Sequence, residues 1–337
     1  MEHKLVRIGS RGSELALWQA HWIRRELVRL HPRVRTSVEI IRTTGDRILD
    51  SPLSGIGEKG LFTKEIEEAL LEDRIDLAVH SLKDLPTELP RGLVIGAVSM
   101  REDVRDVFIP HPSNPVRTLL DQPPGATIAT GSLRRKSQLL NLRPDFRTVD
   151  LRGNLNTRLK KLDESDWAGM VLARAGVARL GWTDRVGETL SVETILPAVG
   201  QGALAVEIRE GDALTAGLIR SLEHWETERA TCAERALLRG LEGGCQVPIG
   251  TFGIVEREGP GEYILRLTAA VGSLDGTTII RGKVHGDPEE AEALGSRLAT
   301  ALLSGGADAI LRSIRPEHAA EEARPSGLAD QSADRGP

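Results

Sequence analysis

The sequence has little cysteine and no long apolar run. Its 337 residues include only two cysteines, Cys232 and Cys245, which are too few for a disulfide framework. They also lack the Cys-x-x-Cys or Cys/His spacing that gathers four ligands, so we expect no metal site. No apolar run approaches the ~18 residues that cross a bilayer, and the first residues lack the pattern of a secretory signal. We therefore expect a cytoplasmic protein that does not enter a membrane.

Positive charge is also scarce. The chain has 44 basic and 49 acidic residues, a net charge of −5, so it lacks the basic surplus that nucleic-acid binding requires. Only eight of the basic residues are lysines. An excess of arginine suits carboxylate recognition, because the planar guanidinium binds both oxygens, although genomic composition bias would give the same count. Any anion site must therefore be local.

The order of the predicted elements indicates two α/β units, and the length suits two or three domains. Strands that alternate with helices predict largely parallel sheets. The first unit has predicted strands at 4–8, 38–42, 77–80 and 93–98, with helices at 14–30 and 63–72. The second has predicted strands at 127–130, 148–151 and 169–173, with helices at 133–142 and 155–162.

The pattern changes after residue 222. A helix to residue 239 precedes three β-rich runs whose glycine-containing turns predict an antiparallel sheet, and a helix at 288–303 would cover one face. The residues from 315 onward are poor in large apolar groups, so we expect a disordered tail.

Arginines follow three of the predicted strands. Arg134 and Arg135 fall in the first turn of a helix capped by Ser132, where the helix dipole disfavours cations. This position predicts an anion nearby, although a solvated helix start would also explain it. Arg11 and Arg152 repeat the scheme, and strand ends of this kind line ligand clefts in α/β sheets.

Two further residues are candidates for chemistry. Asp84 follows a buried strand and enters the same arginine-rich region, where a carboxylate makes sense if it stabilises a cation during reaction. Cys245 lies in a loop beside Gly243 and Gly244, which allow close approach of the backbone to another group. Cys232 lies within a predicted helix, where packing is the expected role.

Several segments resemble the porphobilinogen deaminases, also called hydroxymethylbilane synthases. Residues 234–250, ERALLRGLEGGCQVPIG, resemble the dipyrromethane-attachment motif of that family. Other blocks follow in the family's order: RGSELALWQA from residue 11, HSLKDLP from 80, SLRR from 132, LRGNLNTRL from 151 and LPAVGQGA from 196. The resemblance covers residues 4–313.

The resemblance implies a fold of three domains. Two type II periplasmic-binding-like α/β domains would face each other across a cleft, and a C-terminal α/β domain with a three-stranded antiparallel sheet would present Cys245. The implied boundaries are 1–101 with 200–221, then 102–199, then 222–314, followed by the tail 315–337.

The resemblance also implies the chemistry. One dipyrromethane cofactor per chain would be attached through a thioether to Cys245, and four porphobilinogen molecules would be joined to it head to tail with loss of ammonia. Hydrolysis would release hydroxymethylbilane. Asp84 would be the catalytic carboxylate, porphobilinogen the only partner, and the enzyme a monomer.

The implied binding residues form two overlapping sets. Those for the cofactor are Lys83, Asp84, Ser132, Arg134, Arg135, Arg152 and Ser13. Those for the substrate are Arg11, Ser13, Arg152, Arg158, Arg179, Lys59, Phe62 and Ser81. The chain departs from the pattern at Gly55, where some members have lysine, and at Gly131, where serine is common.

Two other functions fit part of the pattern. A solute-binding or effector-binding module of the periplasmic type would explain the arginines and the two α/β units, but not Asp84 or the Cys245 loop. An enzyme with Lys83 as a Schiff-base lysine for pyridoxal phosphate would explain only that lysine.

Overall fold

The first part of the chain forms a five-stranded sheet. A computed structural model describes residues 5–47, 62–241 and 247–314. The strand order is β2-β1-β3-β10-β4, in which β1 is parallel to β2 and β3, and β10 is antiparallel to both of its neighbours. The strands are β1 (Leu5–Ser10), β2 (Arg35–Ile40), β3 (Leu77–Ser81), β4 (Leu93–Val98) and β10 (Leu204–Arg209).

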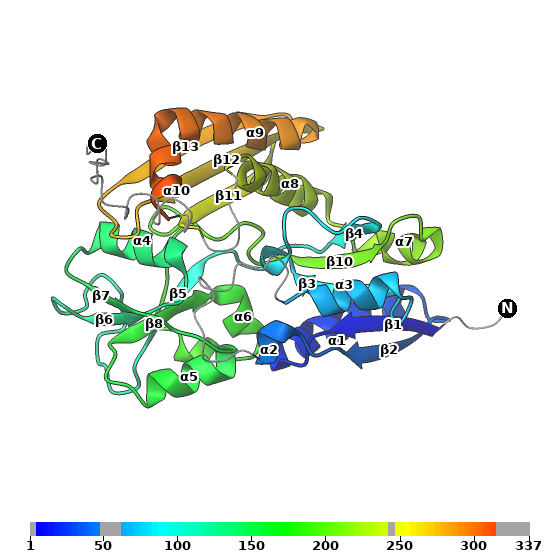
Figure 1. Ribbon diagram of the computed structural model, residues 1–337, viewed down its shortest axis with the longest axis horizontal. Coiled ribbons are helices and arrows are strands. Elements are labelled where there is room, and N and C mark those ends of the chain that lie inside the picture. The colour runs from blue at the N-terminus through cyan, green and yellow to red at the C-terminus, as the bar shows by residue number, and fades with distance from the viewer. Residues whose placement is uncertain (1–4, 48–61, 242–246, 315–337) are drawn as a thin grey trace, which may run out of the picture.

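A second five-stranded sheet repeats this arrangement. Its order is β7-β6-β8-β5-β9, with β6 parallel to β7 and β8, and β5 antiparallel to β8 and β9. The strands are β5 (Asp106–Pro110), β6 (Thr127–Ala129), β7 (Arg147–Val149), β8 (Gly169–Ala173) and β9 (Glu188–Thr189). Figure 1 shows the two sheets side by side, with the C-terminal part of the chain above them.

The antiparallel strand of each sheet is reached by a crossover between the sheets. The chain leaves β4 and enters the second sheet at β5, and it returns from β9 to place β10 between β3 and β4. Strands β5 and β9 were not predicted from the sequence, because β5 follows directly on a charged stretch and β9 has two residues. The expectation of largely parallel sheets was thus incomplete, because an antiparallel strand lies inside each sheet.

Helices pack on both sheets. In α1, Ala20, Ile23 and Leu27 are buried against the first sheet, and the Ser13 hydroxyl caps the helix by accepting from the Ala16 N–H at 3.3 Å. The helices of these two parts are α1 (Glu14–Leu30), α2 (Thr44–Arg47), α3 (Lys64–Leu71), α4 (Leu133–Leu142), α5 (Leu155–Asp163), α6 (Arg174–Arg179) and α7 (Ala213–Ile219).

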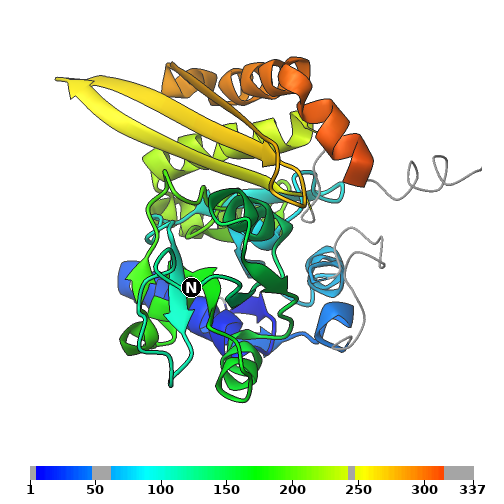
Figure 2. The same ribbon diagram turned by 90° about the vertical axis from the view of Figure 1, so that its left-hand side faces the viewer.

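The C-terminal part has the predicted antiparallel sheet. Its strands are β11 (Ile249–Gly259), β12 (Glu262–Gly272) and β13 (Ile279–Gly286), and Figure 2 shows the long hairpin of the first two. The helices α8 (Trp225–Gly240) and α9 (Ala291–Leu302) share one apolar core with the sheet, and α10 (Asp308–Ile314) follows. A Cβ at Gly295 would lie 2.2 Å from the Ala233 carbonyl oxygen, so glycine allows α8 and α9 to pack closely. The predicted fold class, two related α/β parts and a C-terminal part with an antiparallel sheet, is confirmed.

A buried ion pair fastens the C-terminal part to both crossovers. Arg101, in the first crossover, donates to Glu234 of α8 at 2.7 Å and to the Gln201 carbonyl, in the second crossover, at 2.7 Å. The Glu234 carboxylate also accepts from the N–H groups of Gly200 and Gly253. Since the Glu234 side chain is 0% exposed, this carboxylate depends on its protein partners for solvation.

Replacing Arg101 by Ala should lower the free energy of unfolding by about 3–5 kcal/mol, because the buried Glu234 carboxylate would lose its cation. Urea unfolding followed by tryptophan fluorescence measures the loss. Arg266→Ala is the control, because Arg266 pairs with Glu256 and Glu258 on the surface and should contribute about 1 kcal/mol or less. An Arg101→Ala loss no larger than that of the control would contradict the assignment.

Candidate functional site

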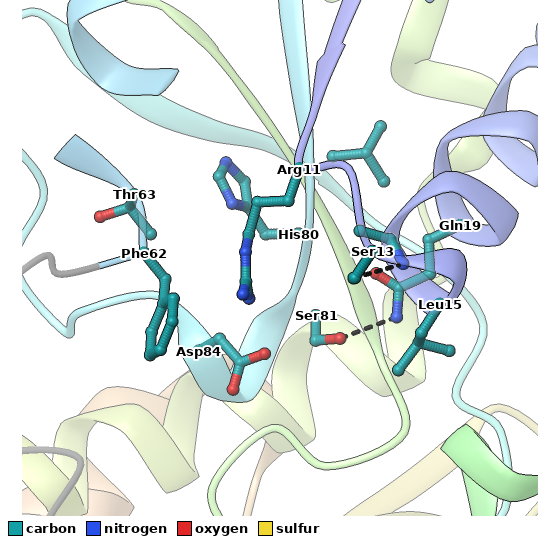
Figure 3. A pocket seen from close by; sticks show the side chains of 11 residues that line it. Arg11, Ser13, Leu15, Gln19, Phe62, Thr63, His80, Ser81 and Asp84 are labelled. Atoms are coloured by element: carbon teal, nitrogen blue, oxygen red, sulfur yellow. Dashed lines mark hydrogen bonds between the residues drawn. The ribbon is translucent and has the colours of Figure 1, made fainter. Parts of the chain in front are cut away.

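A pocket lies at the carboxyl ends of β1 and β3. Figure 3 shows the loop after β1, the turn after β3 and the residues that precede α3 around it. Its lining residues are Arg11, Ser13, Leu15, Ala16, Gln19, Phe62, Thr63, Val79, His80, Ser81 and Asp84. Five of these, Arg11, Ser13, Phe62, Ser81 and Asp84, were predicted as site residues from the sequence, and the structure brings them together.

Arg11 and Asp84 give the pocket opposite charges. The Arg11 guanidinium lies 4.3 Å from the centre of the Phe62 ring and points toward the Asp84 side of the pocket in Figure 3. This cation–π contact restricts the guanidinium to one side of the pocket. Asp84 ends the short helical turn Leu82–Asp84 that follows β3, and its side chain is exposed. A ligand in this pocket therefore meets a carboxylate that is in contact with solvent.

Gln19 was not predicted from the sequence. It lies on α1 with 2% of its surface exposed, and its amide donates to the Ser81 hydroxyl at 2.8 Å. This bond fixes the position of Ser81 at the end of β3. The signal that would have found Gln19 is its spacing of four residues from Leu15 and three from Ala16, which places these three pocket residues on one face of α1.

A second group of charges surrounds Asp106, the first residue of β5. Arg135 donates to both carboxylate oxygens of Asp106 at 3.0 and 2.8 Å, and Arg134 donates to one of them at 2.8 Å. Burial alone would raise the pKa of Asp106, but the charges of Arg134 and Arg135 outweigh it and hold this pKa far below its usual range. The anion predicted beside these arginines is therefore a residue of the protein itself, which the sequence did not indicate.

This cluster keeps an excess of positive charge. Two guanidinium groups face one carboxylate, and the Nε of Arg134 is buried without a hydrogen-bond partner among the described residues. Lys83 lies in the same electrostatic environment. Burial lowers the pKa of Lys83 to about 8, with the Asp84 carboxylate opposing this effect and the Arg135 charge adding to it. The cluster is suited to an additional anion.

Two further arginines of the predicted site, Arg152 and Arg158, lie in the second α/β part. Arg152 donates to Asp150 at 2.6 Å, and Arg158 donates to the Gly153 carbonyl at 2.8 Å. Burial lowers the pKa of Arg158 to about 10; the Arg135 charge adds to this effect, and Asp84 opposes it. Asp84 of the first α/β part thus lies within electrostatic range of an arginine of the second.

Arg179, at the end of α6, bridges the two α/β parts. It donates to the Gly202 carbonyl at 2.7 Å and lies 5.6 Å from the centre of the Trp18 ring on α1. Burial lowers the pKa of Arg179 to about 10, and its Nε has no hydrogen-bond partner among the described residues. The guanidinium is thus held by one bond and one ring contact, while its buried Nε–H remains an unsatisfied donor.

The remaining predicted residues have simpler positions. Ser132 is the N-cap residue of α4 but makes no capping bond with its side chain. Cys232 is half-buried on α8, and burial raises the pKa of its thiol, which agrees with a packing role. Cys245, Lys59 and the tail from residue 315 lie outside the described residues. Within the described ranges, no cluster of acidic, histidine or cysteine side chains is arranged to hold a metal ion.

These features define a class of α/β protein in which a pocket contains an arginine and an exposed carboxylate, and further arginines are buried near them. Residues 6–217 match the family described as "Porphobilinogen deaminase, dipyromethane cofactor binding domain", and residues 229–304 match "Porphobilinogen deaminase, C-terminal domain". The chain belongs to the porphobilinogen deaminase family. In the parts that the structure describes, no helix is both long and apolar enough to cross a membrane.

Curated relatives agree with this assignment. A porphobilinogen deaminase from Chlorobaculum parvum is 54% identical over 318 residues, covering 93% of this chain and 98% of the relative. One from Carboxydothermus hydrogenoformans is 50% identical over 312 residues, covering 93% and 98%. Among solved structures, the BenM effector-binding domain with benzoate gives a TM-score of 0.40 at 15% identity, covering 66% of this chain and 91% of that one. The periplasmic aliphatic sulphonate binding protein SsuA from Escherichia coli gives 0.38 at 15% identity, covering 72% and 71%.

Lys83 should titrate near pH 8 in a chain without bound ligand, because burial disfavours its charged form. Cys245→Ser, which removes the predicted attachment point, provides that chain. Reductive methylation with isotope-labelled formaldehyde followed by NMR titration measures the midpoint, and Lys83→Met identifies the signal. A midpoint near the ordinary 10.5 would show that water solvates this ammonium.

Stability gives a second measurement of the same group. Below pH 8 the partly buried Lys83 cation destabilises the folded state. As the pH rises from 8 to 10.5, the folded chain releases the Lys83 proton before the unfolded chain does. The free energy of unfolding of the wild type should therefore rise relative to that of Lys83→Met across that interval. A constant difference between the two proteins would contradict the lowered pKa of Lys83.

Proposed function

We propose that the chain is a hydroxymethylbilane synthase, a transferase that joins four porphobilinogen molecules head to tail with loss of ammonia. A dipyrromethane attached to Cys245 is the primer, and hydrolysis releases the linear tetrapyrrole hydroxymethylbilane. The observation that carries the proposal is Asp84, an exposed carboxylate in a pocket that also contains Arg11. A pure anion-binding module has no use for such a carboxylate, and family membership sets aside both this rival and the pyridoxal phosphate enzyme.

The residues around Asp106 fit a cofactor that carries carboxylates. Lys83 and Arg134 add positive charge that Asp106 alone does not balance, and the Arg134 Nε is a buried donor without a partner in the described ranges. When bound, the dipyrromethane supplies the free pyrrole carbon to which the first substrate is joined. We propose that Lys83, Arg134 and Arg135 hold its carboxylates, together with Ser13, Ser132 and Arg152.

Asp84 is proposed as the catalytic carboxylate. Loss of ammonia turns the incoming porphobilinogen into a cation, and a carboxylate beside its pyrrole nitrogen stabilises that charge. The condensation also removes a proton from a ring carbon, while the departing ammonia takes one up. Asp84 is exposed to the pocket and is suited to accept and return this proton.

The substrate's acetate and propionate groups require cations at fixed positions. Arg11, held over Phe62, is proposed to bind a carboxylate at the pocket beside Ser81. Arg158 and Arg179 are proposed to bind the side chains of the growing product, together with Arg152. Lys59, which lies outside the described residues, remains part of the proposed substrate set.

The domain boundaries 1–101 with 200–221, 102–199 and 222–314 are proposed as well. They are supported by the place of β10 between β3 and β4, which returns the chain to the first sheet. We also propose that the enzyme acts in the cytoplasm as a monomer, which analytical ultracentrifugation of the purified chain tests.

Asp84→Asn should fold and retain its covalent cofactor but lose at least about 10²-fold in turnover, because the amide cannot offset the positive charge of the reacting pyrrole. Stopped assays of tetrapyrrole formation measure the rate. Asp145→Asn, at a surface ion pair with Arg143, is the matched control and should keep wild-type turnover. Wild-type turnover in Asp84→Asn would remove Asp84 from the mechanism.

The purified chain should carry two linked pyrroles on Cys245. A thioether survives denaturation, so the intact mass under denaturing conditions should exceed the sequence mass by one dipyrromethane. Cys245→Ser should abolish the adduct, and Cys232→Ser should leave it unchanged because Cys232 is a packing residue of α8. Active protein with an unmodified Cys245 would overturn the proposed function.

A further inference from the structure

Three titratable side chains lie within electrostatic range of one another at the pocket, and one of them, His80, also lines it. Glu67 lies on α3, His80 on β3 and Glu207 on β10, and they are 7%, 5% and 0% exposed. In the antiparallel pairing of β10 with β3, Ala205 faces His80. Glu207, two residues further along β10, therefore has its side chain on the same face of the sheet as His80. The helix α3 packs on that face.

The hydrogen bonds of this cluster are incomplete. The Nε2 of His80 lies 3.0 Å from Oε2 of Glu207. The other oxygen of Glu207, Oε1, is buried without a partner, and so is Oε1 of Glu67, among the residues that the structure describes. A buried polar atom without a partner destabilises the folded state, so two of them on neighbouring elements need an explanation.

A proton would satisfy both oxygens. An ionised carboxylate only accepts hydrogen bonds, whereas a protonated one also donates. Two buried carboxylates near each other do not both stay ionised, because each charge disfavours the other. Burial raises the pKa of Glu67, the Glu207 charge adds to this effect, and the Thr63 hydroxyl and His80 oppose it; the Glu68 charge adds a small rise.

We infer that Glu67 is protonated and donates to Glu207, whose other oxygen is bonded to His80. This pair fastens α3 to the two neighbouring strands β3 and β10. The residues next to it are those of the pocket, because Phe62 and Thr63 immediately precede α3, and the turn Leu82–Asp84 follows β3. Glu67, Glu207 and His80 are thus positioning residues for Asp84, a statement that rests on the proposed function.

The test compares Glu67→Gln with Glu67→Leu. The amide of glutamine donates a hydrogen bond as the protonated carboxyl does, whereas leucine leaves Glu207 without a donor. In the full-length holoenzyme, Glu67→Leu should lower kcat by about tenfold while KM changes less than about twofold, because the arginines that bind carboxylates are untouched. Glu67→Gln should restore kcat to within about twofold of the wild type. Glu68→Leu, at an exposed neighbour on α3, is the control and should have no effect.

Two measurements do not depend on activity. Infrared difference spectra at neutral pH should show the carbonyl stretch of a protonated carboxyl in the wild type, and Glu67→Gln should remove it. The folded wild type keeps the Glu67 proton that the unfolded chain releases, so its stability should fall relative to Glu67→Gln as the pH rises above the usual carboxyl range. Both measurements test the shared proton independently of activity. A protein that forms no tetrapyrrole would contradict the proposed function but not this inference.

Several outcomes would overturn the inference. If both carboxylates were ionised, Glu67→Leu would relieve repulsion and make the protein more stable than the wild type. Equal damage by Gln and Leu, or absence of the carbonyl stretch, would also contradict the shared proton. If Glu67→Leu fails to fold, an active and stable Glu67→Gln protein still supports the need for a donor, and an unstable one contradicts it.

Discussion

The carboxylate of Asp106 is the interaction on which the arrangement of the two α/β parts depends. It is fully buried at the start of β5, and it accepts hydrogen bonds from Arg134 and Arg135 of α4 and from the Gln201 amide of the second crossover. The strand that enters the second sheet, the helix that bears the arginines and the returning chain thus meet at one anion. Without it, two buried guanidinium groups would lie side by side with no compensating charge.

The charges around Asp106 do not balance, which distinguishes this group of residues from a neutral network of ion pairs. Two arginines and Lys83 share an electrostatic environment with only one internal carboxylate, so an excess of positive charge remains that the proposed cofactor would neutralise. The other nearby carboxylate, Asp84, is exposed to the pocket and makes no ion pair within 4.0 Å in the described ranges. In the proposed mechanism, anion binding and cation stabilisation therefore belong to different groups that lie within electrostatic range of each other.

The crossovers connect this site to the rest of the molecule. Arg101 of the first crossover bonds to the Gln201 carbonyl of the second and to Glu234 of α8, and the side-chain amide of Gln201 bonds to Asp106. The C-terminal part is therefore fastened to the segments between the sheets. A displacement of either α/β part would therefore strain the hydrogen bonds of Arg101 and Gln201.

The sequence by itself determined the local elements and much of the pocket. The periodicity of apolar residues predicted α4 and β8 at their observed bounds. The rule that strand ends line clefts predicted Arg11 and Asp84 at one site, and the family resemblance added Ser81. Only the tertiary structure decided which buried groups become partners. Asp106 is 28 residues from Arg134, and Gln19 is 62 from Ser81. Such pairs were not predictable from the sequence, because periodicity reports only on residues that are close along the chain. The partner of a buried polar group is set by the tertiary arrangement, which here includes the two crossovers between the sheets.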